Sequence, residues 1–174
     1  MTGLHAHDYV MPPYDYIILA DDWLCNGGVV TDLHWWGNYE LDASNQEKRG
    51  SYINHFHISI HADDPTGLCL PVNSELIGFD VPFSSLVEQN TGLVNNEGSA
   101  IYLYEFVLPQ PFNQIPGNRY WIDICAYSNN PNDPAIWRWQ ESDRSTVPVL
   151  CPAASMTSFA PWQSIVWTSI QPYR

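Results

Sequence analysis

The stretch "NHFHISIHADD", residues 54–64, alternates between apolar and polar side chains. Because successive side chains of an extended chain point in opposite directions, this alternation gives the segment one apolar face and one polar face. A segment with one apolar face is typical of a β-strand that lies on a hydrophobic core. The apolar face holds Phe56, Ile58 and Ile60, and the polar face holds His55, His57, Ser59 and His61.

The same two-residue period continues through most of the chain, in short runs separated by Gly, Pro, Asn and Asp. Helical periodicity is almost absent, and short strands at this spacing are typical of sandwiches and barrels. We therefore predict one all-β domain over residues 1–174, a two-sheet antiparallel β-sandwich of jelly-roll-like form. Residues 1–13 would be an N-terminal extension, and residues 141–174 a C-terminal segment that could be an exchanged or incomplete edge strand. The predicted strands are residues 16–20, 29–37, 53–62, 75–81, 100–108, 119–127, 135–140 and 161–170.

The length and charge of the chain limit its class. A chain of 174 residues is usually one domain with its own hydrophobic core. It carries 19 acidic and 6 basic residues, a formal net charge of −13. Such a surface repels the phosphates of nucleic acids, but it is compatible with divalent cations, neutral glycans or copies of the same chain. No apolar run approaches the roughly 20 residues of a membrane helix. We therefore expect neither nucleic acid binding nor membrane insertion.

The four cysteines, Cys25, Cys69, Cys125 and Cys151, do not have the spacing of a metal site. An even number of cysteines in an acidic chain rich in Trp, Asn and Pro suits an exported protein with one or two disulfides. Buried free thiols explain them equally well. Three pairings are possible, and the spacing does not choose among them. The start "MTGLHAHDYVMPP" lacks the features of a signal peptide, so an exported protein would have lost its signal from this sequence.

A candidate binding face follows from the strands at residues 100–108 and 119–127. If they form a symmetrically closed hairpin, two carboxylates lie opposite each other and need a counter-charge, which an arginine on the strand at 135–140 could supply. The same outer face would carry large apolar groups. Either a loop such as residues 87–100 covers it, or a ligand binds there. The predicted ligand-binding residues are Trp121, Glu105, Asp123 and Arg138.

The histidines at 55 and 57 raise the question of zinc. Side chains at i and i+2 of a strand lie about 6.5–7 Å apart, and two imidazoles can converge on one ion from there. Asp32 or His34 could supply a third ligand if their strand were adjacent. Nothing in the sequence requires this, since a polar strand face explains the histidines without an ion.

Aspartate pairs raise the question of calcium. "LADDW" and "HADDP" both end a predicted strand with such a pair, and "NNPNDP" adds Asn130, Asn132 and Asp133. Calcium takes six to eight oxygen ligands from loop ends of this kind, whereas Asp and Asn also cap turns without any ion. We expect either structural calcium or turn capping, and no other cofactor. The candidate calcium ligands are Asp21, Asp22, Asp63 and Asp64.

The segments "ADDWLC", "VVTDLHWWGNY", "HFHISIHADDP" and "RYWIDICAY" resemble a family of secreted bacterial jelly-roll-like domains of unknown function. The resemblance covers roughly residues 17–140 and rests on an ADDW segment, a WWG-x-Y strand and an F-x-I-x-I strand in that order. It implies a sandwich outside the cytoplasm with no established activity. Such domains tend to finish with a further apolar strand, whereas this chain ends at "SIQPYR". The framework positions that the resemblance implies are Asp21, Asp22, Trp23, Trp35, Trp36 and Gly37.

The sequence contains none of the usual catalytic motifs, such as G-x-S-x-G or H-E-x-x-H. We therefore first expect a non-catalytic extracellular or cell-surface module that builds an assembled structure or filament through contacts between copies of itself. The alternative is a carbohydrate-binding module with an aromatic and acidic face. A metal- or carboxylate-dependent hydrolase comes third. Its carboxylate pair would be Glu105 and Asp123, although Arg138 is better explained as a neutralising partner.

Overall fold

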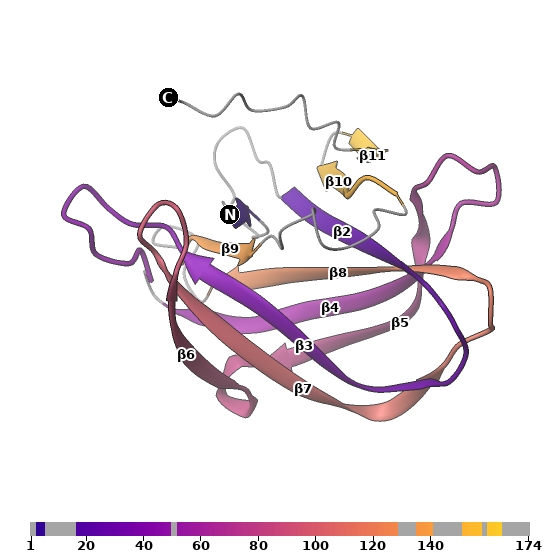
Figure 1. Cartoon of the computed structure of the whole chain (residues 1–174), viewed down its shortest axis with the longest axis horizontal. Coiled ribbons are helices and arrows are strands. Elements are labelled where there is room, and N and C mark those ends of the chain that lie inside the picture. The colour runs from indigo at the N-terminus through magenta and orange to yellow at the C-terminus, as the bar shows by residue number, and fades with distance from the viewer. Residues whose placement is uncertain are drawn as a thin grey trace.

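The computed structural model describes residues 3–5, 17–49, 52–128, 135–140, 151–157 and 160–164. In this part of the chain the strands form two antiparallel sheets that face each other (Figure 1). The helical content of the same residues is a 3-10 turn at Phe83–Ser85. No described helix has the length and apolar character needed to cross a membrane. The predicted class, an all-β two-sheet sandwich, is confirmed.

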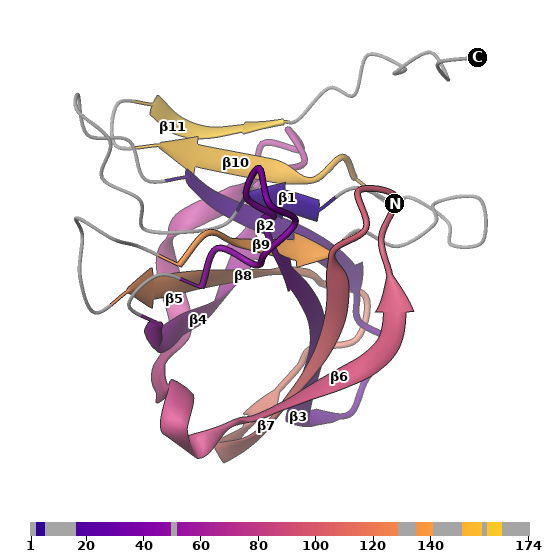
Figure 2. The ribbon, with the colours of Figure 1, turned by 90° about the vertical axis from the view of Figure 1, so that its left-hand side faces the viewer.

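The first sheet has five strands in the order β1-β9-β3-β7-β6. Its long strands β3 and β7 pair antiparallel, while β1 and β6 form the two edges. Figure 2 shows β3, β7 and β6 curving side by side on one side of the sandwich. The bounds are β1 (Gly3–His5), β3 (Val29–Tyr39), β6 (Val87–Val94), β7 (Ala100–Asn113) and β9 (Trp137–Gln140).

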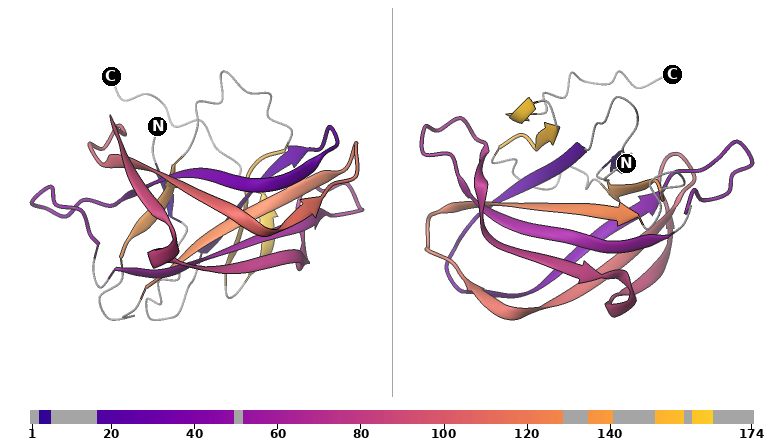
Figure 3. Two further views of the ribbon diagram at one scale, coloured as in Figure 1. Left: turned by 90° about the horizontal axis from the view of Figure 1, so that it is seen from below. Right: turned by 180° about the vertical axis from the view of Figure 1, so that it is seen from behind.

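The second sheet has six strands in the order β11-β10-β2-β8-β4-β5. Strands β10 and β11 come from the C-terminal segment, and β10 pairs with β2 of the same chain. The two views of Figure 3 show this short pair, in yellow, near β2, and β11 also contacts β5. The bounds are β2 (Ile17–Leu24), β4 (Ile53–Asp63), β5 (Pro71–Pro82), β8 (Arg119–Ser128), β10 (Ala154–Thr157) and β11 (Ala160–Ser164).

Consecutive strands repeatedly change from one sheet to the other, as in jelly rolls. The predicted hairpin of residues 100–108 and 119–127 is wrong for this reason. Strand β7 pairs with β3 and β6, whereas β8 pairs with β2 and β4. The connection between them has the residues of a hairpin turn, but such residues serve equally well where the chain crosses to the facing sheet.

The core lies between the sheets and is built largely of aromatic rings. Phe56 is fully buried, and its ring centroid lies 5.6, 5.4 and 5.0 Å from those of Trp35, Tyr104 and Trp137. Gly37 belongs to the same packing, because a Cβ there would lie 2.3 Å from the indole nitrogen of Trp137. The framework role predicted for Gly37 thus has a steric reason, since no other residue fits.

The alternation that opened the sequence analysis assigns the strand faces correctly. In β4 the residues Phe56, Ile58 and Ile60 are buried in the core, and the histidines lie on the opposite face. Strands β7 and β8 follow the same rule. The inward residues there include Tyr102, Tyr104, Phe106, Ile122, Ile124 and Ala126.

A charged cluster lies at the edge of the core, between the segment after β3 and strand β6. The Arg49 guanidinium lies 4.1 Å from the ring centroid of Tyr39 and 4.8 Å from that of Tyr102. It pairs with Glu47 at 2.6 Å and with Glu88 at 2.7 Å. Burial, together with the Glu88 carboxylate, raises the pKa of Tyr39 far above its usual range. These groups satisfy one another, so the cluster holds the segment after β3 against the sheet.

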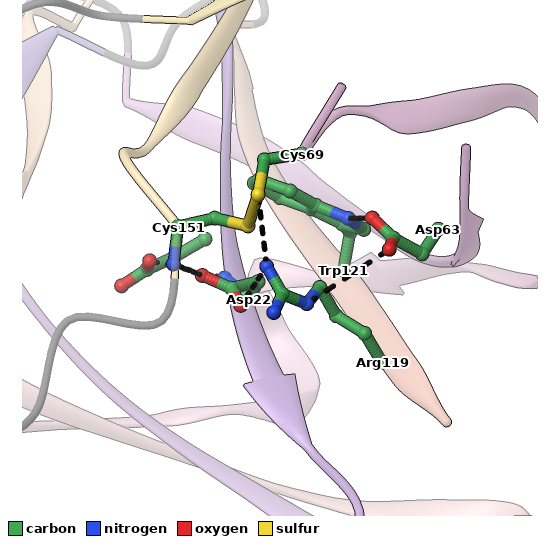
Figure 4. The surroundings of a disulfide bond; sticks show 7 residues. Asp22, Asp63, Cys69, Arg119, Trp121 and Cys151 are labelled. Atoms are coloured by element: carbon green, nitrogen blue, oxygen red, sulfur yellow. Dashed lines mark hydrogen bonds and ion pairs between the residues drawn. A yellow bond between two sulfur atoms is a disulfide. The ribbon is translucent and has the colours of Figure 1, made fainter. Parts of the chain in front are cut away.

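Around Trp121, the outer face of the six-stranded sheet is covered by Cys151 and by strands β10 and β11 of the C-terminal segment. Trp162 packs with Trp121 in a buried cluster on this face. The segment is attached by a disulfide between Cys69 and Cys151 (Figure 4). The predicted cover, residues 87–100, is wrong, because those residues form β6 and its turn into β7 in the other sheet. Cys25 and Cys125 are buried free thiols.

Candidate functional site

The four predicted ligand-binding residues do not share one surface. Glu105 is exposed on the outer face of the five-stranded sheet, opposite His34 and Val87. Trp121 and Asp123 belong to the outer face of the other sheet, where both are buried. The predicted Glu105–Asp123 pair is therefore wrong, and with it the carboxylate pair of a hydrolase, because the two strands lie in different sheets.

Arg138 points to the outer face of the five-stranded sheet, as predicted from the tryptophans on either side of it. Its guanidinium, however, pairs with Glu40 at 2.6 Å and with Glu97. These carboxylates neutralise it in place of the predicted partners, Glu105 and Asp123. Arg138 is 9% exposed, so this cluster fixes the end of β9 and offers little of the arginine to a ligand.

Ser59, His61 and Asp123 form a buried network beneath Trp162. Nε2 of His61 lies 2.6 Å from Oδ2 of Asp123 and 2.7 Å from Oγ of Ser59, and Nδ1 lies 2.9 Å from the Val72 carbonyl oxygen. A hydrolase triad needs the carboxylate on one ring nitrogen and the serine on the other. Here both meet Nε2, and Ser59 donates to Asp123 itself at 2.6 Å. The network suits an imidazolium–carboxylate pair and cannot perform triad chemistry.

The His61–Asp123 pair predicts that the free energy of unfolding depends on pH. Burial lowers the pKa of His61, but the hydrogen bond and charge of Asp123 outweigh it, so the pKa is raised. A histidine whose pKa is higher in the folded chain than in the unfolded chain stabilises the fold when it is protonated. This stabilisation is complete below the pKa of the unfolded chain, about 6.5, and it is lost as the pH rises through the pKa of the folded chain. We expect wild type to lose stability relative to a His61→Gln/Asp123→Asn variant above about pH 6.5, by up to about 1.4 kcal/mol per unit of pKa shift. Urea denaturation from about pH 6 to pH 9 measures this, and a constant difference would contradict it.

The four predicted calcium ligands contact groups of the protein itself. Asp22 and Asp63 flank Arg119, whose guanidinium nitrogens lie 3.4 and 3.9 Å from their carboxylates (Figure 4). Asp64 accepts the backbone N–H of Thr66 at 2.7 Å, which is turn capping.

The fourth candidate ligand, Asp21, makes a local contact. Asp21 is exposed and accepts the N–H of Asp22. Burial raises the pKa of Asp22 despite the arginine, and the Arg119 guanidinium lies between Asp22 and Asp63, where an ion was expected. The prediction that Asp21 and Asp22 end a strand is wrong, because β2 continues to Leu24. Structural calcium stays a prediction, and the candidate ligands Asn130, Asn132 and Asp133 lie outside the described residues.

The condition under which Asp32 or His34 could supply a third zinc ligand to His55 and His57 is not met, because the two strands are not adjacent. Asp32 and His34 lie on β3, in the other sheet from β4. The neighbour of His57 is Asp80 of β5, its Cα partner across the strands, with Oδ1 2.8 Å from Nδ1. The histidine face of β4 therefore meets carboxylates that are distant in sequence.

The feature that stands out as a candidate site is Trp36. Its side chain is 47% exposed, whereas its neighbour Trp35 is 2% exposed in the core. The framework role implied for both tryptophans therefore fits Trp35 and not Trp36. Adjacent strand residues must face opposite ways, so the "WW" pair places one ring inward and one outward. That signal was available in the sequence.

Trp36 lies on the β3 side of a surface, the Trp36 face, which is defined by the outward side chains of β3, β7 and β6. Trp36 lies opposite Leu103, which also lies opposite Gln89. Two exposed valines, Val87 at 70% and Val107 at 75%, extend the apolar part of the face. An apolar surface rimmed by polar residues is typical of a binding site.

The polar part of the Trp36 face surrounds His34. Nε2 of His34 lies 2.8 Å from Asp32, and Nδ1 lies 3.2 Å from Glu105. All three side chains are about half exposed, so they can exchange these contacts for contacts with a ligand. Glu105 is the one residue of the predicted ligand set that lies on this face in an accessible position.

The fold and the Trp36 face together define an antiparallel β-sandwich module with an exposed aromatic surface. Within that class, the chain belongs to the family described as Domain of unknown function (DUF7901), whose match covers residues 1–174. This agrees with the resemblance to a family of unknown function. A comparison with curated proteins found no match, and neither did a comparison with solved structures.

Proposed function

We propose that the chain is an exported, non-catalytic module that binds neutral glycans on the Trp36 face. The observation that carries the proposal is the exposed indole of Trp36 on an open sheet surface. The C–H face of a sugar ring stacks on such an indole, and both surfaces lose contact with water.

The residues around Trp36 supply the polar half of glycan recognition. Glu105 accepts hydrogen bonds from sugar hydroxyls, Gln89 both donates and accepts, and the His34 ring can do either. The carboxylates of Asp32 and Glu105 and the net charge of −13 repel acidic sugars. A neutral glycan fits this chemistry best.

Export is supported by the Cys69–Cys151 disulfide. Structural disulfides form and persist in oxidising compartments and are rare in the cytosol. The disulfide therefore supports an extracellular or cell-surface location, where glycans are accessible ligands.

Assembly from copies of the chain is the second candidate, and the exposed Val87 and Val107 favour it. Two of its sequence-based grounds have another explanation, however. The apolar outer face around Trp121 is covered by the chain's own C-terminal segment, and β10 and β11 extend the sheet beside β2. Like charges on the Trp36 face also oppose stacking of two copies.

Replacing Trp36 with alanine should abolish glycan binding. Because truncating a central aromatic anchor costs about 2 kcal/mol or more, the dissociation constant should rise at least about thirtyfold. A glycan array identifies the ligand for wild type, and titration calorimetry with that glycan measures the change. Trp36→Phe should keep part of the affinity, since a phenyl ring still stacks.

The matched control is Leu68→Ala, which removes another exposed apolar side chain from the β4–β5 connection. It should leave glycan binding unchanged. Light scattering of concentrated protein is run in parallel. The proposal is overturned if wild type binds no glycan, and assembly takes its place if wild type associates while Trp36→Ala stays monomeric.

A further inference from the structure

We propose that His55, His57 and Asp80 form a binding site for a first-row transition-metal ion of the Zn²⁺ type. The site lies on the outer face of the six-stranded sheet, where β4 meets the edge strand β5. It is independent of the Trp36 face, which is on the other sheet.

The Asp80 carboxylate lies within 4 Å of a ring nitrogen of each histidine. Oδ1 of Asp80 is 2.8 Å from Nδ1 of His57 and 3.9 Å from Nε2 of His55. A tetrahedral ion with bonds of about 2.0–2.2 Å holds its ligand atoms about 3.3–3.5 Å apart. The two observed separations lie on either side of that value.

Small movements would bring Asp80 to the ligand spacing of a bound ion with both histidines. As the side chains lie, no three His, Cys, Asp or Glu of the described ranges already surround one point. His55 must approach Asp80 by about 0.5 Å, and the Asp80–His57 hydrogen bond must open by a similar amount. Asp80 is 72% exposed at the sheet edge, so its side chain can adjust without repacking the core.

Glu75 holds His57 from the other side. Its Oε1 lies 3.1 Å from Nε2 of His57. If Nδ1 binds the ion, its proton leaves to solvent, while the Nε2 proton stays shared with Glu75. A carboxylate on the second ring nitrogen is the usual partner of a metal-binding histidine, because it fixes the tautomer and the ring orientation.

Gly78 makes room for this carboxylate. A Cβ at residue 78 would lie 2.2 Å from Oε2 of Glu75 and 3.7 Å from the His57 ring. The second histidine is also held in place, because the His55 ring stacks on Tyr127 with centroids 4.7 Å apart and planes 6° from parallel. Both imidazoles are thus oriented by neighbours that are not ligands.

The donor set selects the ion. Two imidazoles and one carboxylate suit Zn²⁺ and its neighbours in the first transition row, whereas calcium takes six to eight oxygens. Three protein ligands leave a fourth position for water or for a group of another molecule.

Titration calorimetry of the full chain with Zn²⁺ should show one tight site. His55→Gln, His57→Gln and Asp80→Asn should each weaken it at least about tenfold, and Gly78→Ala, which displaces Glu75 without changing any charge, should do so by about tenfold or more. With Co²⁺, wild type should give the visible absorption of a four-coordinate ion, and His55→Gln should lose it.

The matched control is His34→Gln. His34 also lies between two carboxylates, Asp32 and Glu105, and its described ion pairs include no second imidazole. This variant should bind Zn²⁺ as wild type does. The proposal is overturned if wild type binds no Zn²⁺, or if His55→Gln, His57→Gln and Asp80→Asn all fold and bind it with unchanged affinity.

Discussion

Replacing Cys69 and Cys151 together with serine should lower the free energy of unfolding by about 2–5 kcal/mol. The disulfide joins residues 82 apart in sequence, so it removes many conformations from the unfolded chain. In the folded chain it ties Cys151, which precedes β10, to the β4–β5 connection. The C-terminal segment then covers Trp121, which is 0% exposed beneath it. Urea denaturation of wild type and the double variant measures the difference.

Dithiothreitol provides the internal control for this prediction. Reduction should bring wild type down to the stability of the double variant, and it should leave the variant unchanged. Thiol titration of unreduced, denatured wild type should find two free thiols, from Cys25 and Cys125. Four free thiols, or equal stability of the two proteins, would show that the bond does not form.

The two-residue alternation predicted which side of each long strand faces the core, because that property depends on neighbouring residues alone. It could not predict which strands pair. Glu105 and Asp123 have the right parity for a shared outer face, yet their strands lie in different sheets. The alternation tells which face of its strand a side chain lies on, but it is the same whichever strand is the neighbour, so it does not identify the neighbour.

Strand β6 was missed for a local reason. Its sequence "VEQNTGLV" is polar and contains a glycine, which is typical of a loop, and its pairing with β7 shifts register between Asn90 and Val94. The strand is stabilised by its neighbours more than by its own propensity. The cover over Trp121 was missed because it depends on contacts across most of the chain.

In the candidate sites, too, the local features could be predicted from the sequence and the tertiary contacts could not. The polar histidine face of β4 was predicted from local sequence, but Asp80 and Glu75 come from the next strand and its bulged register. Trp36 could have been found from the adjacent Trp35, because one of two neighbouring strand tryptophans must face outward. The buried pairs of Arg119 and Asp22 and of His61 and Asp123 depend on tertiary contacts that no spacing rule gives.

The aspartate pairs illustrate why the spacing of acidic residues was misleading as a sign of a metal ion. Aspartate pairs after two predicted strands suggested an ion between them, and the structure has Arg119 there instead. A guanidinium between two carboxylates balances their charge as a metal cation would, and the protein itself supplies it. Sequence patterns of acidic residues therefore predict a need for positive charge, without saying whether an ion or an arginine supplies it.

Replacing Phe56 with alanine should lower the free energy of unfolding by about 3–5 kcal/mol, which is a large part of the stability of a domain of this size. Phe56 is 0% exposed, and its ring contacts Trp35 and Trp137 as well as Tyr104, so it joins the two sheets. Large aromatic neighbours cannot close the cavity, because each is held by its own strand. Urea denaturation followed by tryptophan fluorescence measures the loss.

Phe79→Ala is the matched control for this prediction, because it makes the same chemical change at the edge of the core. Phe79 is only partly buried, and its ring contacts Phe106 with centroids 5.6 Å apart. Solvent can fill the space that alanine leaves there, so the loss should be less than half of that for Phe56→Ala. Phe56→Leu should fall between the two, since it keeps most of the buried apolar volume. Equal losses at residues 56 and 79 would mean that the two sheets do not meet on the Phe56 ring, and the inward assignment of β4 would then be wrong.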